Sequence, residues 1–204
     1  MEWAKTVRSL RLRLRLKQDA MAELIGVSQT YVSRLEAGIA EPAPHVADAI
    51  RKLSQNPRTR STFDDFVATI RHSPFHCFLV HPQPEAGRYI LEAASPSLAR
   101  IAPMVSAAGD LAACPAIEPM RSQIDAVCAA GLDEGRVLSA TAYWIDTSAE
   151  PRCWMTLYIP IRDETGACFV HGTATELAPD DFEQRRAEAG RDIVLELFEP
   201  GSAG

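Results

Sequence analysis

Apolar residues recur at helical spacing through the N-terminal part of the chain. This spacing places them on one side of each helix, where they can form a core. The residues before Lys17 also alternate with a period of two, as in a strand, but arginine and leucine are good helix formers and favour a helix. The predicted helices cover residues 3–16, 18–25, 28–36 and 44–53.

A short turn is predicted to hold two of these helices at a fixed angle. Gly26 can adopt the left-handed conformation that ends a helix at low cost, and Ser28 is a favourable N-cap for the next helix. The opposite side of that second helix is left with polar residues. The residues expected to face inward are Met21, Leu24 and Ile25 on the first helix of the pair, and Val32 and Leu35 on the second.

The outer side of the helix at residues 28–36 offers hydrogen-bonding groups suited to reading DNA bases. It carries Gln29, Thr30, Ser33 and Arg34. Glutamine can bond adenine in two places, arginine can do the same to guanine, and hydroxyl groups donate or accept. The same pattern is also compatible with an ordinary pair of antiparallel helices that has a polar surface.

The stretch from Leu16 to Gly38 resembles the helix-turn-helix of the XRE family, the lambda repressor and Cro type, which often reads L-x-Q-x-x-L-A-x-x-x-G-V-S-x-x-x-I-S-x-x-E-x-G. The matching residues are Leu16, Gln18, Ala22, Gly26, Val27, Ser28, Val32, Ser33, Glu36 and Gly38, with Met21 in place of a leucine.

The resemblance implies that Gln18 and Gln29 reach DNA bases together, with further groove contacts from Thr30 and Ser33. Tyr31 stands where the family commonly has a small residue, so its role is open. The candidate DNA-binding residues are therefore Gln18, Ser28, Gln29, Thr30, Tyr31, Ser33 and Arg34 for the groove, with Arg8 and Arg15 for the phosphates.

The two parts of the chain carry opposite net charge. Residues 1–60 hold 11 Lys or Arg against 6 Asp or Glu, and residues 61–204 hold 10 against 21, within an overall charge of −6. Nucleic-acid phosphates attract a positive domain and repel a negative one. We therefore expect two domains with different partners.

From Thr62 onward the pattern changes to strands that alternate with helices. A short amphipathic helix is expected before Pro74, and the segment 163–166 is a hairpin signal between the last two strands. The predicted strands are residues 75–82, 88–95, 136–145, 152–161 and 167–177, with a helix at 119–130 before the third strand.

This order of elements resembles a PAS domain, in which a five-stranded antiparallel sheet carries its helices on one face and often encloses a ligand. The strings EAASPSLARI (92–101) and PIRDETGACFVHGTATEL (160–177) add to the resemblance, the second through its P-x-x-D-x-x-G pattern. A different small α+β domain is the alternative. The predicted fold class is α+β, with an N-terminal all-α helix-turn-helix domain and a C-terminal PAS-like five-stranded sheet with helices.

The predicted boundaries complete this domain organisation. A helix should begin near Pro179, because Asp180 and Asp181 suit a first helical turn. The apolar run 193–198 is expected to be a helix that packs on the PAS-like domain or across a two-fold axis, with a strand as the alternative. The predicted segments are 1–57 for DNA binding, 58–62 as a linker, 63–178 as a PAS-like sensor and dimerisation domain, and 179–204 as a C-terminal helix and tail.

No cofactor and no metal site are predicted. Five cysteines without CxxC spacing indicate reduced thiols and not disulfides or a zinc site. A haem held by His171 and Met104, or bound at Cys114, and a small organic ligand are alternatives. A solid core and a ligand pocket are both compatible with the aromatic and sulfur-containing residues Phe78, Tyr89, Trp154, Met155, Tyr158 and Phe169.

The sequence favours a regulator over an enzyme. No lysine follows Lys52, which excludes the Ser-Lys self-cleavage found in some repressors of this helix-turn-helix class, and no other catalytic motif is found. No apolar run approaches the ~20 residues of a membrane span, and the N-terminus lacks a signal-peptide core, so a cytoplasmic location without a membrane partner is expected.

The expected function is sequence-specific transcription regulation, as a repressor or an activator. A homodimer would bind a palindromic operator in double-stranded DNA, and the C-terminal domain would dimerise, with a small molecule or another protein as a candidate partner. The alternatives are an adaptor whose C-terminal domain mainly binds another protein, such as a polymerase subunit, a kinase or a second regulator, and an antitoxin-type autoregulator.

Overall fold

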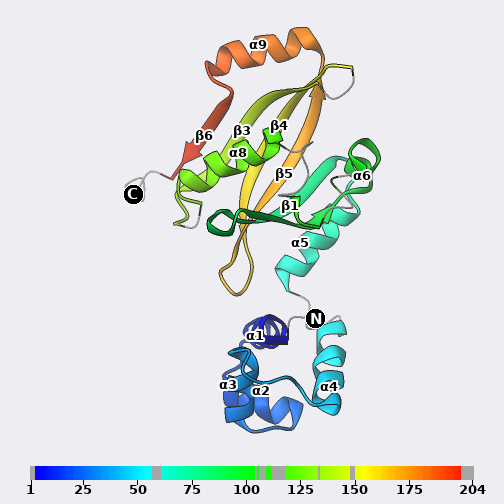
Figure 1. Ribbon diagram of the computed structural model, residues 1–204, viewed down its shortest axis with the longest axis vertical. Coiled ribbons are helices and arrows are strands. Elements are labelled where there is room, and N and C mark those ends of the chain that lie inside the picture. Colours follow the sequence, from blue (N-terminus) through cyan, green and yellow to red (C-terminus); the bar gives the residue numbers. More distant parts are fainter. Residues whose placement is uncertain are drawn as a thin grey trace. The chain divides into compact units, whose positions relative to one another are not determined.

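The computed structural model describes residues 3–56, 61–103, 105, 109–111, 118–132, 134–147 and 150–198. Two compact units are formed, which Figure 1 draws as ribbons. The first contains Met1–Phe66 and Arg162–Ala167, and the second contains Val67–Ile161 and Cys168–Gly204.

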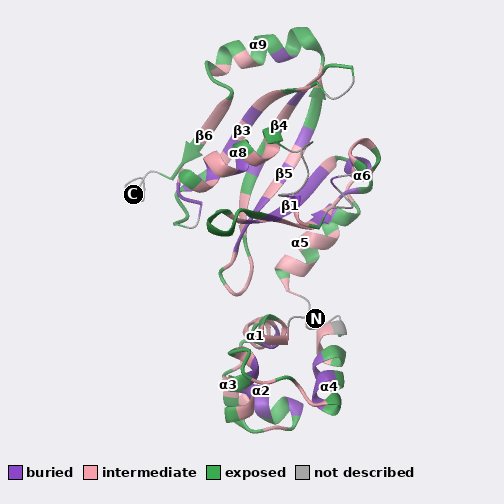
Figure 2. Ribbon diagram, in the orientation of Figure 1, coloured by how far each residue is buried: buried purple, intermediate pink, exposed green. Residues whose placement is uncertain are grey.

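The first unit contains the helices that the apolar spacing predicts. The first helix ends earlier than expected, because Arg15 adopts a left-handed backbone conformation with a φ of 54°. Figure 2 shows the buried residues of these helices on the sides that face one another. The helices are α1 (Trp3–Arg13), α2 (Gln18–Ile25), α3 (Gln29–Glu36) and α4 (Pro44–Gln55), and their buried core is Val7, Leu10, Met21, Ala22, Ile25, Val32, Leu35, Val46 and Ile50.

The turn between α2 and α3 has the predicted chemistry. Gly26 ends α2 in the left-handed conformation, with a φ of 73°, and the N–H of Val27 donates to the carbonyl of Ala22 over 2.9 Å. The Ser28 hydroxyl accepts a hydrogen bond from the N–H of Tyr31, which satisfies a donor that the helix leaves unpaired. These contacts fix how α3 leaves the turn.

The prediction that Leu24 faces inward was wrong. Its side chain is 49% exposed, whereas Met21 and Ile25 are buried together with Ala22. With 3.6 residues per turn, Leu24 lies roughly 110° around the helix axis from the centre of that buried stripe. The small Ala22 takes the inner position, in the core that α2 shares with α3.

The second unit is an α+β domain built on an antiparallel sheet. β1 pairs antiparallel with β2 and β5, and β3 pairs antiparallel with β4 and β6, so that the strand order is β2-β1-β5-β4-β3-β6. The predicted α+β class is confirmed. The strands are β1 (His76–Gln83), β2 (Arg88–Ala94), β3 (Val137–Asp146), β4 (Arg152–Arg162), β5 (Cys168–Leu177) and β6 (Ile193–Leu197).

Helices connect these strands, and α8 packs on one face of the sheet. In Figure 1, α8 crosses that face in front of β3 and β4. Its buried residues Ile124 and Val127 share a core with Ala140, Ala142 and Tyr158 of the sheet. The helical elements are α5 (Thr62–Arg71), η2 (Pro84–Ala86), α6 (Pro96–Ile101), α8 (Glu118–Ala129) and α9 (Pro179–Ala189).

The apolar run near the C-terminus is a strand, and the helix expected there was wrong. β6 pairs with β3 in the register Ala142↔Ile193 and Ala140↔Leu195, which gives the sheet six strands where five were expected. Gly190 ends α9 with a φ of 69°, and the β-branched residues that follow favour an extended chain. Since the edge of β3 is otherwise unpaired, these residues gain ladder hydrogen bonds along the side that faces β3.

Candidate functional site

The polar side of α3 presents the predicted base-reading groups to solvent. Gln29, Thr30 and Arg34 are exposed, and Ser33 is half-buried. The opposite side of the helix buries Val32 and Leu35 completely. This eight-residue helix therefore separates a core face from a face rich in donors and acceptors.

A chain of polar contacts positions Gln29. Its side-chain Nε2 donates to Oε1 of Gln18 over 2.8 Å, and Nε2 of Gln18 donates to Oε2 of Glu36 over 2.9 Å. Arg11 donates two hydrogen bonds to the same carboxylate, from Nε to Oε1 over 2.6 Å and from a terminal nitrogen to Oε2 over 3.1 Å. The two glutamines that the XRE resemblance pairs are thus adjacent, and they are anchored to α1.

The Arg11–Glu36 ion pair ends this series of contacts, and the pKa values of both groups are shifted. Burial raises the pKa of Glu36, but hydrogen bonds from Arg11 and Gln18 and the charge of Arg8 outweigh burial and hold the pKa below its ordinary value. The hydrogen bond to Glu36 raises the pKa of Arg11. Both groups therefore stay charged, and charge-assisted, two-point contacts of this kind fix orientation well.

Sequence reasoning missed the positioning role of Arg11. Its guanidinium also donates to the carbonyl of Leu16 over 3.1 Å, so it holds the connection from α1 to α2 as well. The motif glutamate at position 36 was the available signal, because a half-buried carboxylate requires a cationic partner.

Tyr31 and Ser28 have contacts within the protein. The Tyr31 hydroxyl donates to the carbonyl of Glu41 over 3.0 Å and accepts from the N–H of Ala43 over 3.1 Å, which closes the loop between α3 and α4. Ser28 caps α3. The expected DNA contacts of these two residues stay predictions, but each has a structural task that explains its residue type.

The predicted phosphate contacts Arg8 and Arg15 are both exposed. Arg8 lies on α1, and Arg15 lies in the connection to α2. Arginine side chains at such positions are free to reach a polyanion without breaking the core.

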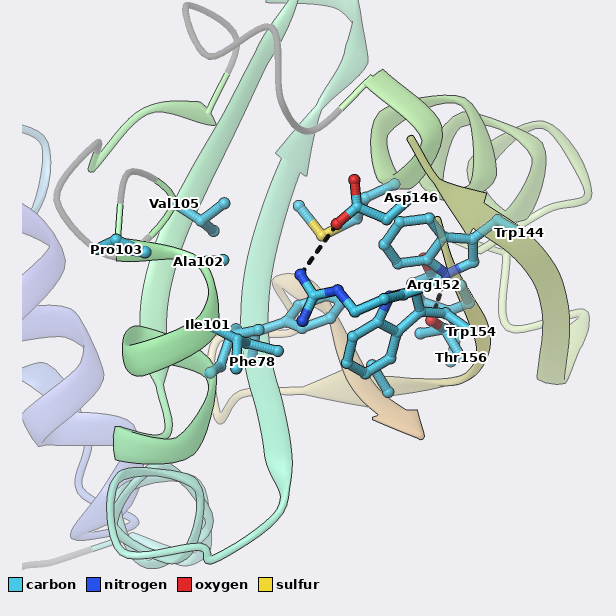
Figure 3. Close-up of a pocket in the computed structure, with 14 residues that line it drawn as sticks. Phe78, Ile101, Ala102, Pro103, Val105, Trp144, Asp146, Arg152, Trp154 and Thr156 are labelled. Atoms are coloured by element: carbon cyan, nitrogen blue, oxygen red, sulfur yellow. Dashed lines mark hydrogen bonds and ion pairs between the residues drawn. The ribbon is translucent and has the colours of Figure 1, made fainter. Parts of the chain in front are cut away.

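The second unit contains a cavity of about 300 Å³ between the sheet and the helices. Figure 3 shows Ile101, Ala102 and Val105 on one side of it, opposite Trp144 and Trp154. The described residues that line it are Phe78, Leu98, Ile101, Ala102, Pro103, Val105, Met120, Trp144, Asp146, Arg152, Trp154, Thr156, Tyr158 and Ala174.

Several polar contacts order the cavity wall. Arg152 pairs with Asp146 over 3.1 Å, and the indole N–H of Trp144 donates to the hydroxyl of Thr156 over 2.9 Å. The Tyr158 hydroxyl donates to Oε1 of Gln123 over 2.5 Å. Burial raises the pKa of Tyr158 above its ordinary value, so its phenol stays protonated and remains a donor.

The residues predicted to form a core or a pocket are buried, except Met155, which is half-buried, and they divide between the cavity wall and the rest of the core. Phe78, Trp154 and Tyr158 line the cavity, and Tyr89, Met155 and Phe169 do not. Residues 155 and 169 lie on the opposite face, since side chains alternate along a strand.

The haem alternative gains no geometric support from the described residues. His171 does not line the cavity, and burial lowers its pKa. Met104 and Cys114 lie outside the described residues. The cysteines within the described residues, Cys77, Cys128, Cys153 and Cys168, form no disulfide with one another.

The described ranges contain neither a candidate metal site nor a candidate membrane-spanning helix. Within them, no group of three or more His, Cys, Asp or Glu residues is placed to hold a metal ion. No helix in the same ranges has both the length and the apolar character needed to cross a membrane.

Comparisons with known proteins support the N-terminal assignment. Residues 7–53 match the family model HTH_3, described as helix-turn-helix, which confirms the motif predicted from the sequence. No curated protein matches the chain.

Solved structures resemble the chain in fold alone. The LOV protein of Rhodobacter sphaeroides is 20% identical, with a TM-score of 0.42, over 63% of this chain and 73% of that one. An RNA-binding light-oxygen-voltage receptor is 9% identical, with a TM-score of 0.44, over 92% of this chain and 63% of that one. A complex of phage VqmA with DPO is 10% identical, with a TM-score of 0.40, over 63% of this chain and 58% of that one.

Proposed function

We propose that the protein is a sequence-specific, DNA-binding transcription regulator, not an enzyme, that acts as a homodimer on a palindromic operator. The second unit holds the dimer together and senses a small molecule. The observation that carries the proposal is the exposed polar side of α3, where Gln29 is held by Gln18 and, through Glu36, by Arg11.

The anchored glutamines suit base reading because major-groove recognition needs donors and acceptors held in fixed directions. A freely rotating glutamine loses side-chain entropy when it binds, whereas one already held by a neighbour loses less. In the first unit, positive charge from Arg8 and Arg15 adds sequence-independent attraction to phosphates. The negative second unit is suited to other partners.

Dimerisation is expected because one short recognition helix contacts only one half-site. Two copies related by a two-fold axis read two half-sites about one helical turn apart, ~34 Å. An exposed apolar surface on β3 and β4 supports contact with a second copy. It consists of Ile145, Leu157 and Ile159, which are 40%, 37% and 37% exposed and lie on the sheet face opposite the cavity, because residues 145, 157 and 159 alternate with the cavity-lining residues of these strands.

The cavity favours a sensor over an adaptor. An adaptor needs a docking surface but no internal space, whereas a ligand sensor needs a preformed, mostly apolar cavity with a few polar groups. The second unit has such a cavity, lined mostly by apolar and aromatic side chains.

The test is selection of binding sites from a random duplex library with the full-length protein, followed by electrophoretic shift assays. We expect enrichment of a symmetric sequence and a specific shift that weakens as salt is raised. Failure to shift any duplex at low salt would contradict the proposal.

A pair of substitutions tests dimerisation separately from DNA binding. Leu157→Arg combined with Ile159→Arg should give a monomer in sedimentation velocity and bind the selected operator more weakly. Gln184→Arg is the matched control, because Gln184 is exposed on α9, and it should stay dimeric. A double variant that remains a dimer would refute this interface.

A further inference from the structure

The first unit includes a segment that is distant in sequence from its helices, namely the hairpin Arg162–Ala167 between β4 and β5. We propose that Glu164, in the turn of this hairpin, is a positioning residue for DNA recognition that holds α1 and, through α1, the two glutamines of α2 and α3. The inference rests on the proposed regulatory function and adds a residue outside the helix-turn-helix to the groups that prepare base reading.

Glu164 contacts two residues of α1. The Ser9 hydroxyl donates a hydrogen bond to Oε1 of Glu164, and Nε of Arg13 forms an ion pair with the same oxygen over 3.4 Å. Ser9 and Arg13 lie four residues apart, so their side chains share one face of the helix. The side chains of Arg13 and Glu164 are only 10% and 17% exposed, and solvent therefore screens this pair less than an exposed one.

A second contact holds Arg13 from α5. The Arg13 guanidinium donates to the carboxylate of Asp64. Asp64 in turn exchanges two hydrogen bonds of 3.0 Å with Ser61, one from the N–H of each residue to the side-chain oxygen of the other, and this reciprocal pair caps the start of α5. Arg13, the last residue of α1, is therefore held by two carboxylates that come from different segments.

The turn that carries Glu164 is fixed by its own hydrogen bonds. The Asp163 carboxylate accepts from the N–H of Thr165 over 2.8 Å and from the N–H of Ala167 over 2.9 Å. Gly166 adopts a left-handed conformation with a φ of 85°, which glycine does at little cost. Because these residues flank Glu164 on both sides, its carboxylate is presented to α1 from a defined backbone.

Contacts on opposite sides of α1 link the hairpin with Gln29. Arg11 is two residues from both Ser9 and Arg13, so its side chain leaves the helix roughly 160° away from theirs. It binds Glu36 there, where the series of contacts that holds Gln29 begins. Loss of the hairpin contact would loosen the end of α1 and this series with it, and Gln29 would then lose more side-chain entropy when it binds a base.

An electrostatic effect of Glu164 on DNA would have a different signature. Removal of a negative charge from a DNA-binding unit strengthens attraction to phosphates and raises affinity for all duplexes alike. Removal of a positioning contact lowers the affinity for the operator relative to other duplexes. Discrimination, the ratio of the two affinities, therefore separates these roles.

Glu164→Gln tests the contact with a small change, since glutamine keeps the size of the side chain and can still accept from Ser9. Discrimination between the selected operator and a scrambled duplex should fall about twofold to thirtyfold, while affinity for the scrambled duplex stays equal or rises. Glu134→Gln is the matched control. Glu134 pairs with Arg136 over 2.7 Å, but these side chains are 67% and 58% exposed, and discrimination should equal that of wild type.

Two further measurements separate positioning from a general loss of structure. The NMR signals of the side-chain amides of Gln18 and Gln29 should shift in Glu164→Gln and should stay in place in Glu134→Gln. The double variant Arg13→Gln with Glu164→Gln should lose no more discrimination than Arg13→Gln alone, because residues that act through one contact are not additive. Unchanged amide signals in Glu164→Gln, or additive losses, would overturn the proposal.

The NMR measurement needs no DNA, so it distinguishes this inference from the proposed function. If wild type shifts its operator and Glu164→Gln discriminates equally well, the role of Glu164 is refuted and the regulator stands. If the amide signals shift in Glu164→Gln but wild type binds no duplex, the regulator is refuted and the positioning contact stands.

Discussion

Gln18 accepts a hydrogen bond of 2.8 Å from the side-chain amide of Gln29, although the two lie 11 residues apart on different helices. The contact exists because Gly26 and Ser28 fix the turn between α2 and α3. It directs the exposed end of Gln29 away from the core, and Gln18 is itself held by Glu36. Base recognition by α3 is therefore expected to depend on residues that lie on three helices.

Replacement of Gln29 tests base recognition directly. Gln29→Ala should reduce discrimination between the selected operator and a scrambled duplex by about 1–3 kcal/mol, while affinity for the scrambled duplex changes little. Competition shift assays measure both quantities. Gln184→Ala is the control, since Gln184 is exposed on α9 and bonded to another side chain, that of Glu188. Unchanged discrimination in Gln29→Ala would exclude this residue as a reader of bases.

The low pKa of Glu36 predicts how acid affects the first unit. A carboxyl whose pKa is depressed in the folded state stabilises the fold above its unfolded pKa of about 4.3 and loses that contribution as the pH falls through the folded value. Glu36→Gln should therefore cost about 1 kcal/mol at pH 7, and the difference from wild type should shrink below pH 4.3.

Urea unfolding between pH 3 and pH 7 measures this effect, with Trp3 as the reporter. Trp3 packs against the core of the first unit, and the change Trp144→Phe with Trp154→Phe leaves Trp3 as the single tryptophan of the chain, which has 3. A loss of unfolding free energy in Glu36→Gln that grows as the pH falls would contradict this prediction. It would show that burial, and not the hydrogen bonds from Arg11 and Gln18, determines the direction of the Glu36 pKa shift.

The helix-turn-helix could be predicted from the sequence because its signals are local. Gly26 and Ser28 act within one turn of their own positions, and the buried spacing of Val32 and Leu35 is that of any α-helix. The role of Tyr31 could not be predicted in this way. It depends on the backbone of Glu41 and Ala43, whose position is fixed only when the loop before α4 closes.

The sequence pattern alone does not determine that β6 is a strand or which residues line the cavity. The apolar run 193–198 fits a helix end as well as a strand, and only the otherwise unpaired edge of β3 decides between them. The residues predicted to form a core or a pocket included both Trp154 and Met155. These two are neighbours on one strand, so their side chains must lie on opposite faces of the sheet. Which face holds the cavity depends on how α8 packs, and the sequence alone does not determine that.

Phosphate attraction can be separated from base reading through Arg8. Because Arg8 is exposed on α1, Arg8→Ala should weaken binding to all duplexes alike and reduce the salt dependence of the binding constant by about one ion. Arg15→Asn should act similarly, since asparagine tolerates the left-handed backbone found at this position. Arg100→Ala, at an exposed site on α6, is the control for loss of one positive charge. A salt dependence equal to that of wild type in Arg8→Ala would remove this residue from the interface.

Gly172 and Phe78 form the tightest approach next to the cavity, and this contact predicts a rescue. A Cβ atom at position 172 would overlap the ring of Phe78, which is buried and lines the cavity. Gly172→Ala should therefore destabilise the second unit by about 1–3 kcal/mol through overpacking, measured as urea unfolding by the fluorescence of Trp144 and Trp154. The smaller side chain in Phe78→Leu leaves space, so the double variant should lose less stability than the sum of the single variants. Additive losses would show that the new methyl group is accommodated elsewhere and that Phe78 does not require glycine at position 172.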